Sequence, residues 1–328
     1  MSTTIAANPT GNPLLRVMKT YPMEIILAVL VVLLIFTAPG FASLGNFLNV
    51  LRTVSMLGII AFGMTAVIIA GEIDLSVGAG AALAGCIVAW FAGAFGDAMG
   101  EGAATLVGFL AALAVGFSTG FLTGKLRQWF NVPTFIATLA LFTALRGAAN
   151  LITGGFPLTT FPSSFGFFGG GYLFGIPFPV YIFLLTFAGM HFLMNYTRFG
   201  RAVYAVGGNM EAARLSGIDI WWTKAMTLGL TGVLTAVSGT LIASQIGSGT
   251  GTTATGMELD VIAAVIIGGA SLFGGKGRIW GTLIGVLFLG CISNGMTLMN
   301  VNEYWQYVVR GGIILGAVLL NQVLERVR

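Results

Sequence analysis

Three short stretches of the sequence gather acidic and polar side chains, and two of them share the same spacing. Glu72 and Asp74 form one Glu-x-Asp pair, and Glu258 and Asp260 form another, each at the start of an apolar run. Carboxylates, like the hydroxyl of Ser76, can cap a helix by accepting hydrogen bonds from its free N–H groups. The alternative is a gate or pathway role, because acidic groups near a membrane are costly unless they are used.

The third stretch runs from Asn209 to Asp219 and has the pattern of a short, capped helix. We expect Asn209 to cap its start, Glu211 to lie in its first turn, and Gly217 to end it in a left-handed conformation. The residues between are Ala212, Ala213, Arg214, Leu215 and Ser216. Such an amphipathic helix is either a solvated loop or a docking site for a partner.

None of these stretches supplies a catalytic or metal-binding set. The chain has one histidine, His191, and its two cysteines, Cys86 and Cys291, lie in apolar runs. The glycine-rich run before Arg278 fails the Walker A pattern, because Ala270 stands at its first glycine and Gly277 follows Lys276. We therefore expect no enzyme activity and no cofactor in this chain, with any ATP and Mg²⁺ held by another subunit.

The composition predicts a membrane protein. Charged residues make up 8% of the 328 residues, against about 25% in soluble domains. Apolar residues reach 56%, and the mean hydropathy is +0.94. These values exclude a soluble globular protein, a disordered chain and a nucleic-acid binder, and the net charge of +4 is spread over short loops.

The apolar runs predict an all-α polytopic protein with a single transmembrane domain over residues 1–328. A spanning helix needs about 20 mostly apolar residues. Ten candidates follow: 23–39, 53–71, 75–95, 103–123, 133–152, 177–196, 223–243, 258–272, 280–299 and 305–324. The third and the eighth, which begin beside the Glu-x-Asp pairs, are candidates for short or broken spans. The first run is too long for a signal peptide and lacks a convincing cleavage site.

The distribution of basic residues predicts the orientation. With ten spans and both termini in the cytoplasm, cytoplasmic segments hold 12 of the 15 basic residues. These are Arg16, Lys19, Lys125, Arg127, Arg198, Arg201, Arg214, Lys224, Lys276, Arg278, Arg326 and Arg328. Residues 1–20 then form a cytoplasmic tail and 197–222 a cytoplasmic loop, whereas the uncharged segment 153–176 packs on the external face or binds a ligand there.

Short similarities suggest an internal repeat. Gly71–Leu75 is similar to Met257–Val261, Thr105–Gly108 is similar to Thr282–Gly285, and Arg146-Gly147 is similar to Arg310-Gly311. In the ten-span topology, spans 2–5 and 7–10 run in opposite directions, which is typical of inverted repeats in transport proteins. Chance similarity between apolar helices is the alternative. Glycines at four-residue spacing, Gly116/Gly120/Gly124 and Gly281/Gly285, predict close helix packing, either within the chain or between two copies.

Together these motifs resemble a known family. The Glu-Ala-Ala-x-x-x-Gly stretch at 211–217, the Ile-Asp-Leu-Ser-Val-Gly turn at 73–78 and the stretch Glu258–Gly285 resemble the membrane permease of ribose-type ABC importers. The resemblance extends from about residue 24 to 324. Two positions differ from the usual pattern, with Glu72 in place of a frequent glycine and Ala270 in place of a frequent threonine.

The resemblance implies partners and a location. It implies a homodimer in the bacterial inner membrane and a cytoplasmic ATPase with fused nucleotide-binding halves, which docks on 209–219. It also implies a periplasmic solute-binding protein that delivers a monosaccharide or cyclitol such as ribose, another pentose or hexose, or myo-inositol.

An uncharged polyol needs hydrogen-bonding and aromatic side chains. The candidate pathway residues are Phe135, Thr138, Phe142, Asn150 and Asn294, with ordinary helix packing as the alternative.

Other functions remain open at this level. A permease of the same type could carry branched-chain amino acids, nucleosides or a signalling sugar derivative. An ion-coupled secondary transporter is a different class, disfavoured because the acidic residues are expected at span ends, with the two Glu-x-Asp pairs on opposite faces. A membrane-embedded enzyme lacks a catalytic set.

Overall fold

The computed structural model of this chain describes residues 22–326. Within that range the chain forms thirteen α-helices, one 3-10 helix and one two-stranded hairpin. Seven of the helices are long and apolar enough to cross a membrane. The expected all-α polytopic membrane protein is therefore confirmed. The expected cytoplasmic tail, with Arg16 and Lys19, lies outside the described residues.

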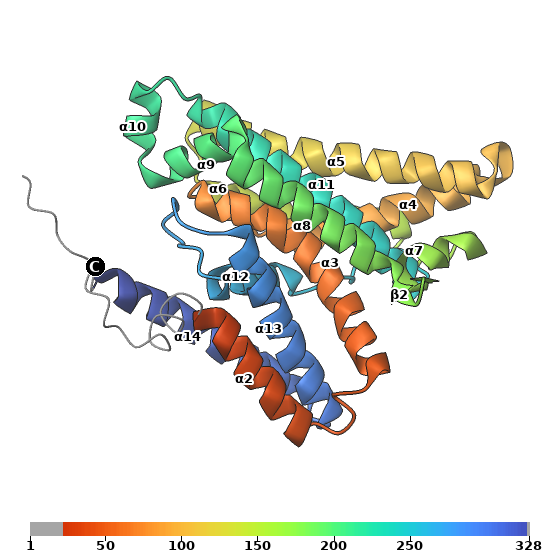
Figure 1. The fold of residues 1–328 in the computed structure, drawn as a ribbon. Helices are drawn as coiled ribbons and strands as arrows, with labels where there is room; N and C mark the ends of the chain where they lie inside the picture. Colours follow the sequence, from red (N-terminus) through yellow and green to blue (C-terminus); the bar gives the residue numbers. More distant parts are fainter. Residues whose placement is uncertain (1–21, 327–328) are drawn as a thin grey trace, which may run out of the picture.

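Seven helices meet the length and composition of a membrane span (Figure 1): α3 (Leu44–Ile69), α4 (Val77–Met99), α5 (Glu101–Phe130), α6 (Thr134–Thr153), α8 (Phe178–Tyr196), α11 (Ile220–Ile246) and α13 (Ile279–Leu298). The remaining elements are α2 (Pro22–Thr37), η1 (Ser163–Phe165), α7 (Gly166–Gly170), β1 (Tyr172–Leu173), β2 (Ile176–Pro177), α9 (Arg198–Gly208), α10 (Met210–Leu215), α12 (Met257–Ile267) and α14 (Glu303–Arg326).

Each of the ten expected spans coincides with one helix, but ten full spans are not confirmed. The helix α2 has 16 residues and α12 has 11, and α14 is not among the seven membrane candidates. The helix α12 is short because glycines in the left-handed region lie on both sides of it, Gly256 with φ +82° and Gly269 with φ +88°. The expected short or broken eighth span is confirmed, whereas α4, the third, has 23 residues.

Glycines bring the helices of the centre into close contact. The helix α11 packs along α5, α4 and α3. A Cβ atom on Gly116 or Gly120 of α5 would overlap main-chain atoms of Gly232 or Leu228 in α11. Gly281 and Gly285 of α13 meet the end of α12 in the same way. Both glycine motifs therefore serve packing within the chain, as small residues do in membrane proteins.

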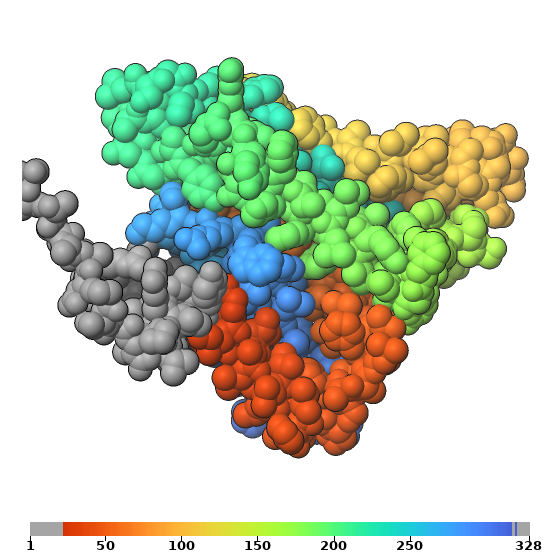
Figure 2. All heavy atoms as spheres, in the orientation of Figure 1, coloured from red at the N-terminus to blue at the C-terminus, as the bar shows by residue number. Residues whose placement is uncertain are grey.

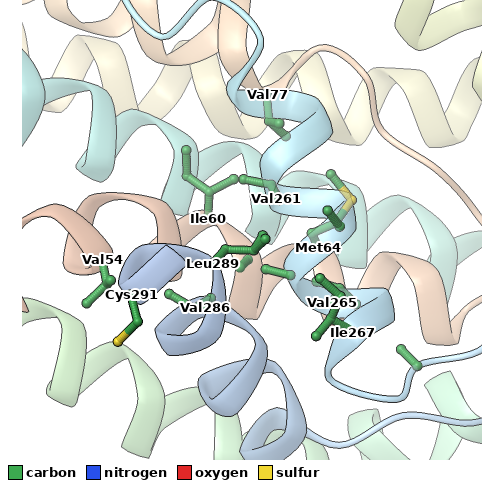
Figure 3. Packing of buried hydrophobic residues seen from close by; sticks show 14 of the residues in the cluster. Val54, Ile60, Met64, Val77, Val261, Val265, Ile267, Val286, Leu289 and Cys291 are labelled. Atoms are coloured by element: carbon green, nitrogen blue, oxygen red, sulfur yellow. The ribbon is translucent and has the colours of Figure 1, made fainter. Parts of the chain in front are cut away.

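The short helix α12 is held by an apolar core. Val261, Val265 and Ile267 of α12 are buried with side chains of α3 and α13, and Val77 from the first turn of α4 joins the same cluster (Figure 3). Because residues from four separate helices contribute, this core fixes the position of α12 between the helices that surround it.

The two irregular segments of the chain lie at opposite ends of the molecule. The helix α10 projects at one end, and α7 and β2 lie at the other (Figures 1 and 2). The segment before α8 packs onto the end of α11, where Leu158 pairs with Gly249 and the backbone N–H of Gly169 donates to Ser244 Oγ over 2.8 Å. The segment 153–176 therefore packs against the rest of the chain, and its expected external position stays a prediction.

Candidate functional site

The helix α10 forms as its sequence predicts and is largely exposed. Asn209 caps its start, because the side-chain Oδ1 accepts a hydrogen bond from the backbone N–H of Ala212 over 2.9 Å. Gly217 follows its end with φ +79°, where the N–H groups of Gly217 and Ile218 donate to the carbonyls of Arg214 and Ala213. Only Ala213 is buried, whereas Leu215 is 77% exposed.

Charge on α10 is held within the helix. Arg214 Nε donates to Glu211 Oε2 over 3.1 Å, and both side chains are 65% exposed. This hydrogen bond lowers the pKa of the Glu211 carboxyl and raises the pKa of the Arg214 guanidinium. Because the carboxyl pKa is lowered, the pair persists as pH falls and is lost only below the ordinary carboxyl range. The outer surface of α10 is therefore apolar at Met210 and Leu215, with a balanced ion pair beside them.

The same loop contains a second helix, α9, whereas the sequence predicted only one helix there. Thr197 caps it through Oγ1, which accepts from the N–H of Gly200 over 3.2 Å. Gly207 of α9 lies against the carbonyl of Ile69, the last residue of α3, and the N–H of Gly275 donates to that carbonyl over 2.8 Å. The helix α9 thus ties the loop that carries α10 to the end of α3.

Glu72 lies in a buried ion cluster just after α3. Its carboxylate accepts from Lys224 Nζ over 2.6 Å and from Arg127 over 3.1 Å. The side chains of Glu72 and Lys224 are 2% and 5% exposed. The cluster joins the break between α3 and α4 to the ends of α5 and α11, where α11 begins directly after the loop of α10.

Asp74 and Ser76 form a closed turn before α4. Ser76 occupies the N-cap position, but its side chain makes no cap hydrogen bond. Instead Asp74 Oδ1 accepts from the backbone N–H of Ser76 over 2.8 Å and from its hydroxyl over 2.6 Å. Capping by the Ser76 side chain is therefore not observed, whereas the Asp74 carboxylate accepts a backbone N–H at the start of α4 and fixes the turn.

The two Glu-x-Asp motifs are not on opposite sides of the molecule. The Glu258 carboxylate lies against Gly78 in the first turn of α4, so closely that a Cβ atom on this glycine would overlap it. Glu258 is buried, and its Oε2 has no hydrogen-bond partner among the described residues. The expected separation was wrong, because α12 has only 11 residues and begins beside the start of α4.

Asp260 belongs to a second polar cluster. Arg310 of α14 donates to Asp260 over 3.0 Å through Nη1 and to the Ser293 hydroxyl of α13 over 2.8 Å through Nη2. Asp260 and Arg310 are 26% and 29% exposed. This cluster ties the start of α12 to α13 and α14.

The helix α6 places two polar residues, Arg146 and Asn150, and the ring of Phe142 near the turn before α12. Arg146 Nη1 donates to the carbonyls of Gly251 and Thr253 over 2.6 and 2.7 Å. The Phe142 ring lies 5.8 Å from this guanidinium, and the Asn150 amide packs against Gly251. Phe142 and Asn150, expected in the pathway, thus lie next to a structural contact made by Arg146.

The other expected pathway residues are dispersed. Phe135 is 51% exposed at the start of α6, and Thr138 is buried, with its hydroxyl donating to the carbonyls of Ile73 and Phe135 over 3.3 and 3.2 Å. Asn294 exchanges two amide hydrogen bonds with Asn46, of 2.9 and 2.8 Å. The five residues therefore do not form one site, and their role in transport stays a prediction.

Sequence reasoning missed the cations that pair with the acidic motifs. Lys224 and Arg127 were assigned to loops, and Arg146 and Arg310 were noted only as falling within spans. A charged side chain inside an apolar helix is itself a signal, because it needs a partner there. Among the described residues, no group of three His, Cys, Asp or Glu side chains could hold a metal ion.

Comparison with known proteins agrees with this arrangement of apolar helices and an exposed helix at one end. Residues 46–318 match the family described as branched-chain amino acid transport system/permease component. The chain belongs to this family of multi-pass transport permeases.

Its curated relatives include ribose permeases, which confirms the resemblance drawn from the motifs. The ribose import permease protein RbsC of Escherichia coli strain K12 is 42% identical over 92% of this chain and 95% of its own length. That of Bacillus subtilis strain 168 is 43% identical over 90% of both chains. The xylose transport system permease protein XylH of Haemophilus influenzae is 33% identical over 93% of this chain and 96% of its own. No solved structure matches the chain.

Proposed function

We propose that this chain is the permease subunit of a binding-protein-dependent ABC importer for a monosaccharide. The observation that carries the proposal is the identity of 42–43% with ribose import permeases over at least 90% of both chains. The relative named for xylose supports a pentose in particular. Hexoses and myo-inositol stay within the proposal. Branched-chain amino acids, nucleosides and signalling sugar derivatives are the alternatives, and the uptake assay below tests the first two with leucine and uridine.

A cytoplasmic ATPase with fused nucleotide-binding halves docks on α10 and supplies the ATP and Mg²⁺ chemistry. Support comes from the exposure of Met210, Leu215 and the Glu211–Arg214 pair at the tip of the molecule. Force on α10 reaches α11 directly along the chain and α3 through α9. It then reaches Glu72 through Lys224, so the break between α3 and α4 is the proposed gate.

The opposite end receives the binding protein. The segment 153–176 packs on the end of α11 and exposes Phe156 and Phe174, which are 76% and 92% exposed. Apolar side chains at such an end suit a transient protein contact. In this proposal the chain lies in the bacterial inner membrane with both termini in the cytoplasm.

A second copy of the chain completes the pathway. The helix α6 keeps most of its surface uncovered, including Ile136, Leu139 and Leu151. Such a face is covered by lipid or by another apolar helix, and a homodimer supplies the latter.

Helix packing supports the proposed inverted repeat. The helix α11 packs against α4 and α5, and α3 packs against α12 and α13. The helix α4 contacts α6, as α12 contacts α14. These pairings are the ones expected if α3–α6 correspond to α11–α14.

Ion-coupled transport is the second candidate function. Glu258 favours it, because a buried carboxylate with an unpartnered oxygen beside two helix N-termini is a common ion or proton site in transporters. The two candidates differ in their energy source, which the reconstitution at the end of the Discussion measures.

Uptake by cells tests the substrate. In this assay, cells that lack their own ribose, xylose, arabinose and inositol permeases express this chain together with its partner ATPase and binding protein. We expect accumulation of one labelled sugar of that panel and no accumulation of leucine or uridine. Accumulation of leucine or uridine, with no accumulation of any sugar of the panel, would overturn the proposal.

A further inference from the structure

A cavity of about 270 Å³ lies among five helices, and we call it the five-helix cavity. One polar side chain from each helix faces it. These side chains are Thr53 of α3, Gln245 of α11, Asp260 of α12, Ser293 of α13 and Arg310 of α14. None of the five was expected as a pathway residue, although Asp260 was expected as a gate or turn residue.

The charges in this cavity are internally balanced. Arg310 donates to both Asp260 and Ser293, so the only two charged groups of the lining neutralise each other. A ligand with a fixed charge would have to break this pair. A neutral ligand instead finds the remaining lone pairs of Asp260 and Ser293 available as acceptors.

Two further side chains offer free hydrogen-bonding capacity. The Thr53 hydroxyl donates to the carbonyl of Asn49 over 3.1 Å, which leaves its oxygen free to accept. The side-chain amide of Gln245 has no partner among the described residues and offers two donors and an acceptor. Sugar hydroxyls both donate and accept, so this mixture suits them.

The rest of the lining is apolar, including Leu57, Leu289 and Ile292. These side chains match the C–H faces of a sugar ring. The volume lies just below the range of about 300–1,000 Å³ typical of sites for drug-sized ligands, so it fits one monosaccharide.

A larger cavity elsewhere lacks these features. It measures about 350 Å³ and lies between α5, α7, α8 and α11, lined mainly by apolar side chains that include Phe109, Phe168 and Phe178. Its two threonines, Thr105 and Thr240, donate to carbonyls of their own helices. It therefore offers few partners to a polyol.

We infer that the five-helix cavity binds the transported monosaccharide within the membrane domain. The inference rests on the proposed function, and it adds the side chains that hold the sugar: Thr53, Gln245 and Ser293 through hydrogen bonds, and the Asp260–Arg310 pair as a neutral wall.

Protection of an introduced cysteine tests the site. Thr53→Cys places a thiol at the cavity, and the natural Cys86 and Cys291 are buried. The test uses the assembled transporter and the sugar that cells accumulate in the uptake assay above. At millimolar concentration, this sugar should slow the modification of Thr53→Cys by a small thiol reagent several-fold, relative to the rate without sugar. Gln128→Cys, at an exposed position near the end of α5 and outside both the cavity lining and the proposed binding-protein contact, should react equally with and without that sugar. Equal rates for Thr53→Cys under both conditions would overturn the inference.

A pair of matched glutamine variants provides the second readout. Gln245→Leu should lower the maximal uptake rate roughly two- to tenfold, the range expected for loss of one hydrogen bond. Gln128→Leu, on the exposed end of α5, should leave uptake unchanged, and both variants should assemble with the ATPase. Normal uptake by Gln245→Leu together with unprotected Thr53→Cys would reject the cavity while leaving the proposed function intact. Failure of the unaltered chain to accumulate any sugar would reject the proposed function itself.

Discussion

Glu72 lies between two cations, Lys224 and Arg127, that come from helices distant in the sequence. The Glu-x-Asp spacing predicted a polar turn at the start of α4, and the structure has one. The partners were not predictable, because Arg127 lies 55 residues and Lys224 lies 152 residues from Glu72 in the sequence. Only the packing of α5 and α11 brings them together. The same holds for Asp260 and Arg310.

Loss of Lys224 tests this cluster. Lys224→Met leaves a buried carboxylate short of a partner, and we expect the free energy of unfolding to fall by about 3 kcal/mol. The double variant Glu72→Gln/Lys224→Met should recover much of that loss, because no charge is left unpaired. Unfolding of the purified chain in mixed micelles, followed by circular dichroism, provides the measurement.

A surface lysine provides the control for that experiment. Lys125 lies one turn before Gln128 near the end of α5, where it makes an exposed hydrogen bond to Gln128 and lies 5.7 and 5.9 Å from the Phe121 and Trp222 rings. Lys125→Met should change stability by less than about 1 kcal/mol. An equal loss in Lys125→Met and Lys224→Met would show that burial of the Glu72 pair contributes nothing.

At the scale of elements, apolar runs and capping residues predicted where helices lie. The caps of α10 were predictable because Asn209 and Gly217 act locally through their own backbone neighbours. The helix α9 was missed because it has only 11 residues, and the buried Val203 and Val206 find their partners in the rest of the fold, including the end of α3. The contact of α12 with α4 was missed because the sequence does not show which of the two candidate short spans, the third or the eighth, is the short helix.

Charge reversal on α10 tests the docking helix. Glu211→Arg should leave stability within about 0.5 kcal/mol of the unaltered chain, because the pair is exposed. It should nevertheless reduce the amount of ATPase that co-purifies. Glu101→Arg, at the opposite end of the molecule, should not. Full retention of the ATPase by Glu211→Arg and by Arg214→Glu would remove α10 from the docking surface.

For the whole molecule, composition and charge distribution predicted an α-helical membrane protein and an orientation. The structure adds that α10 and the segment around β1 and β2 lie at opposite ends. It could not be predicted from the sequence that Glu258 lies against Gly78 of α4, because that depends on how the proposed repeats pack against each other.

Labelling from each side of the membrane tests the orientation. Leu215→Cys and Phe174→Cys carry thiols at exposed positions, 77% and 92% exposed, and the natural cysteines are buried. A membrane-impermeant reagent added to intact spheroplasts should label Phe174→Cys and leave Leu215→Cys unlabelled. Inverted vesicles should show the reverse. Labelling of Leu215→Cys in intact spheroplasts would contradict the cytoplasmic position of α10.

Reconstitution provides the most direct measurement of the central claim that this chain is a sugar pathway driven by a separate ATPase. Proteoliposomes contain the purified chain with or without its ATPase, with binding protein and labelled sugar outside and ATP with Mg²⁺ inside. We predict sugar accumulation against its gradient only when both the ATPase and ATP are present. Accumulation by the chain without the ATPase, driven by a proton or sodium gradient, would contradict the account.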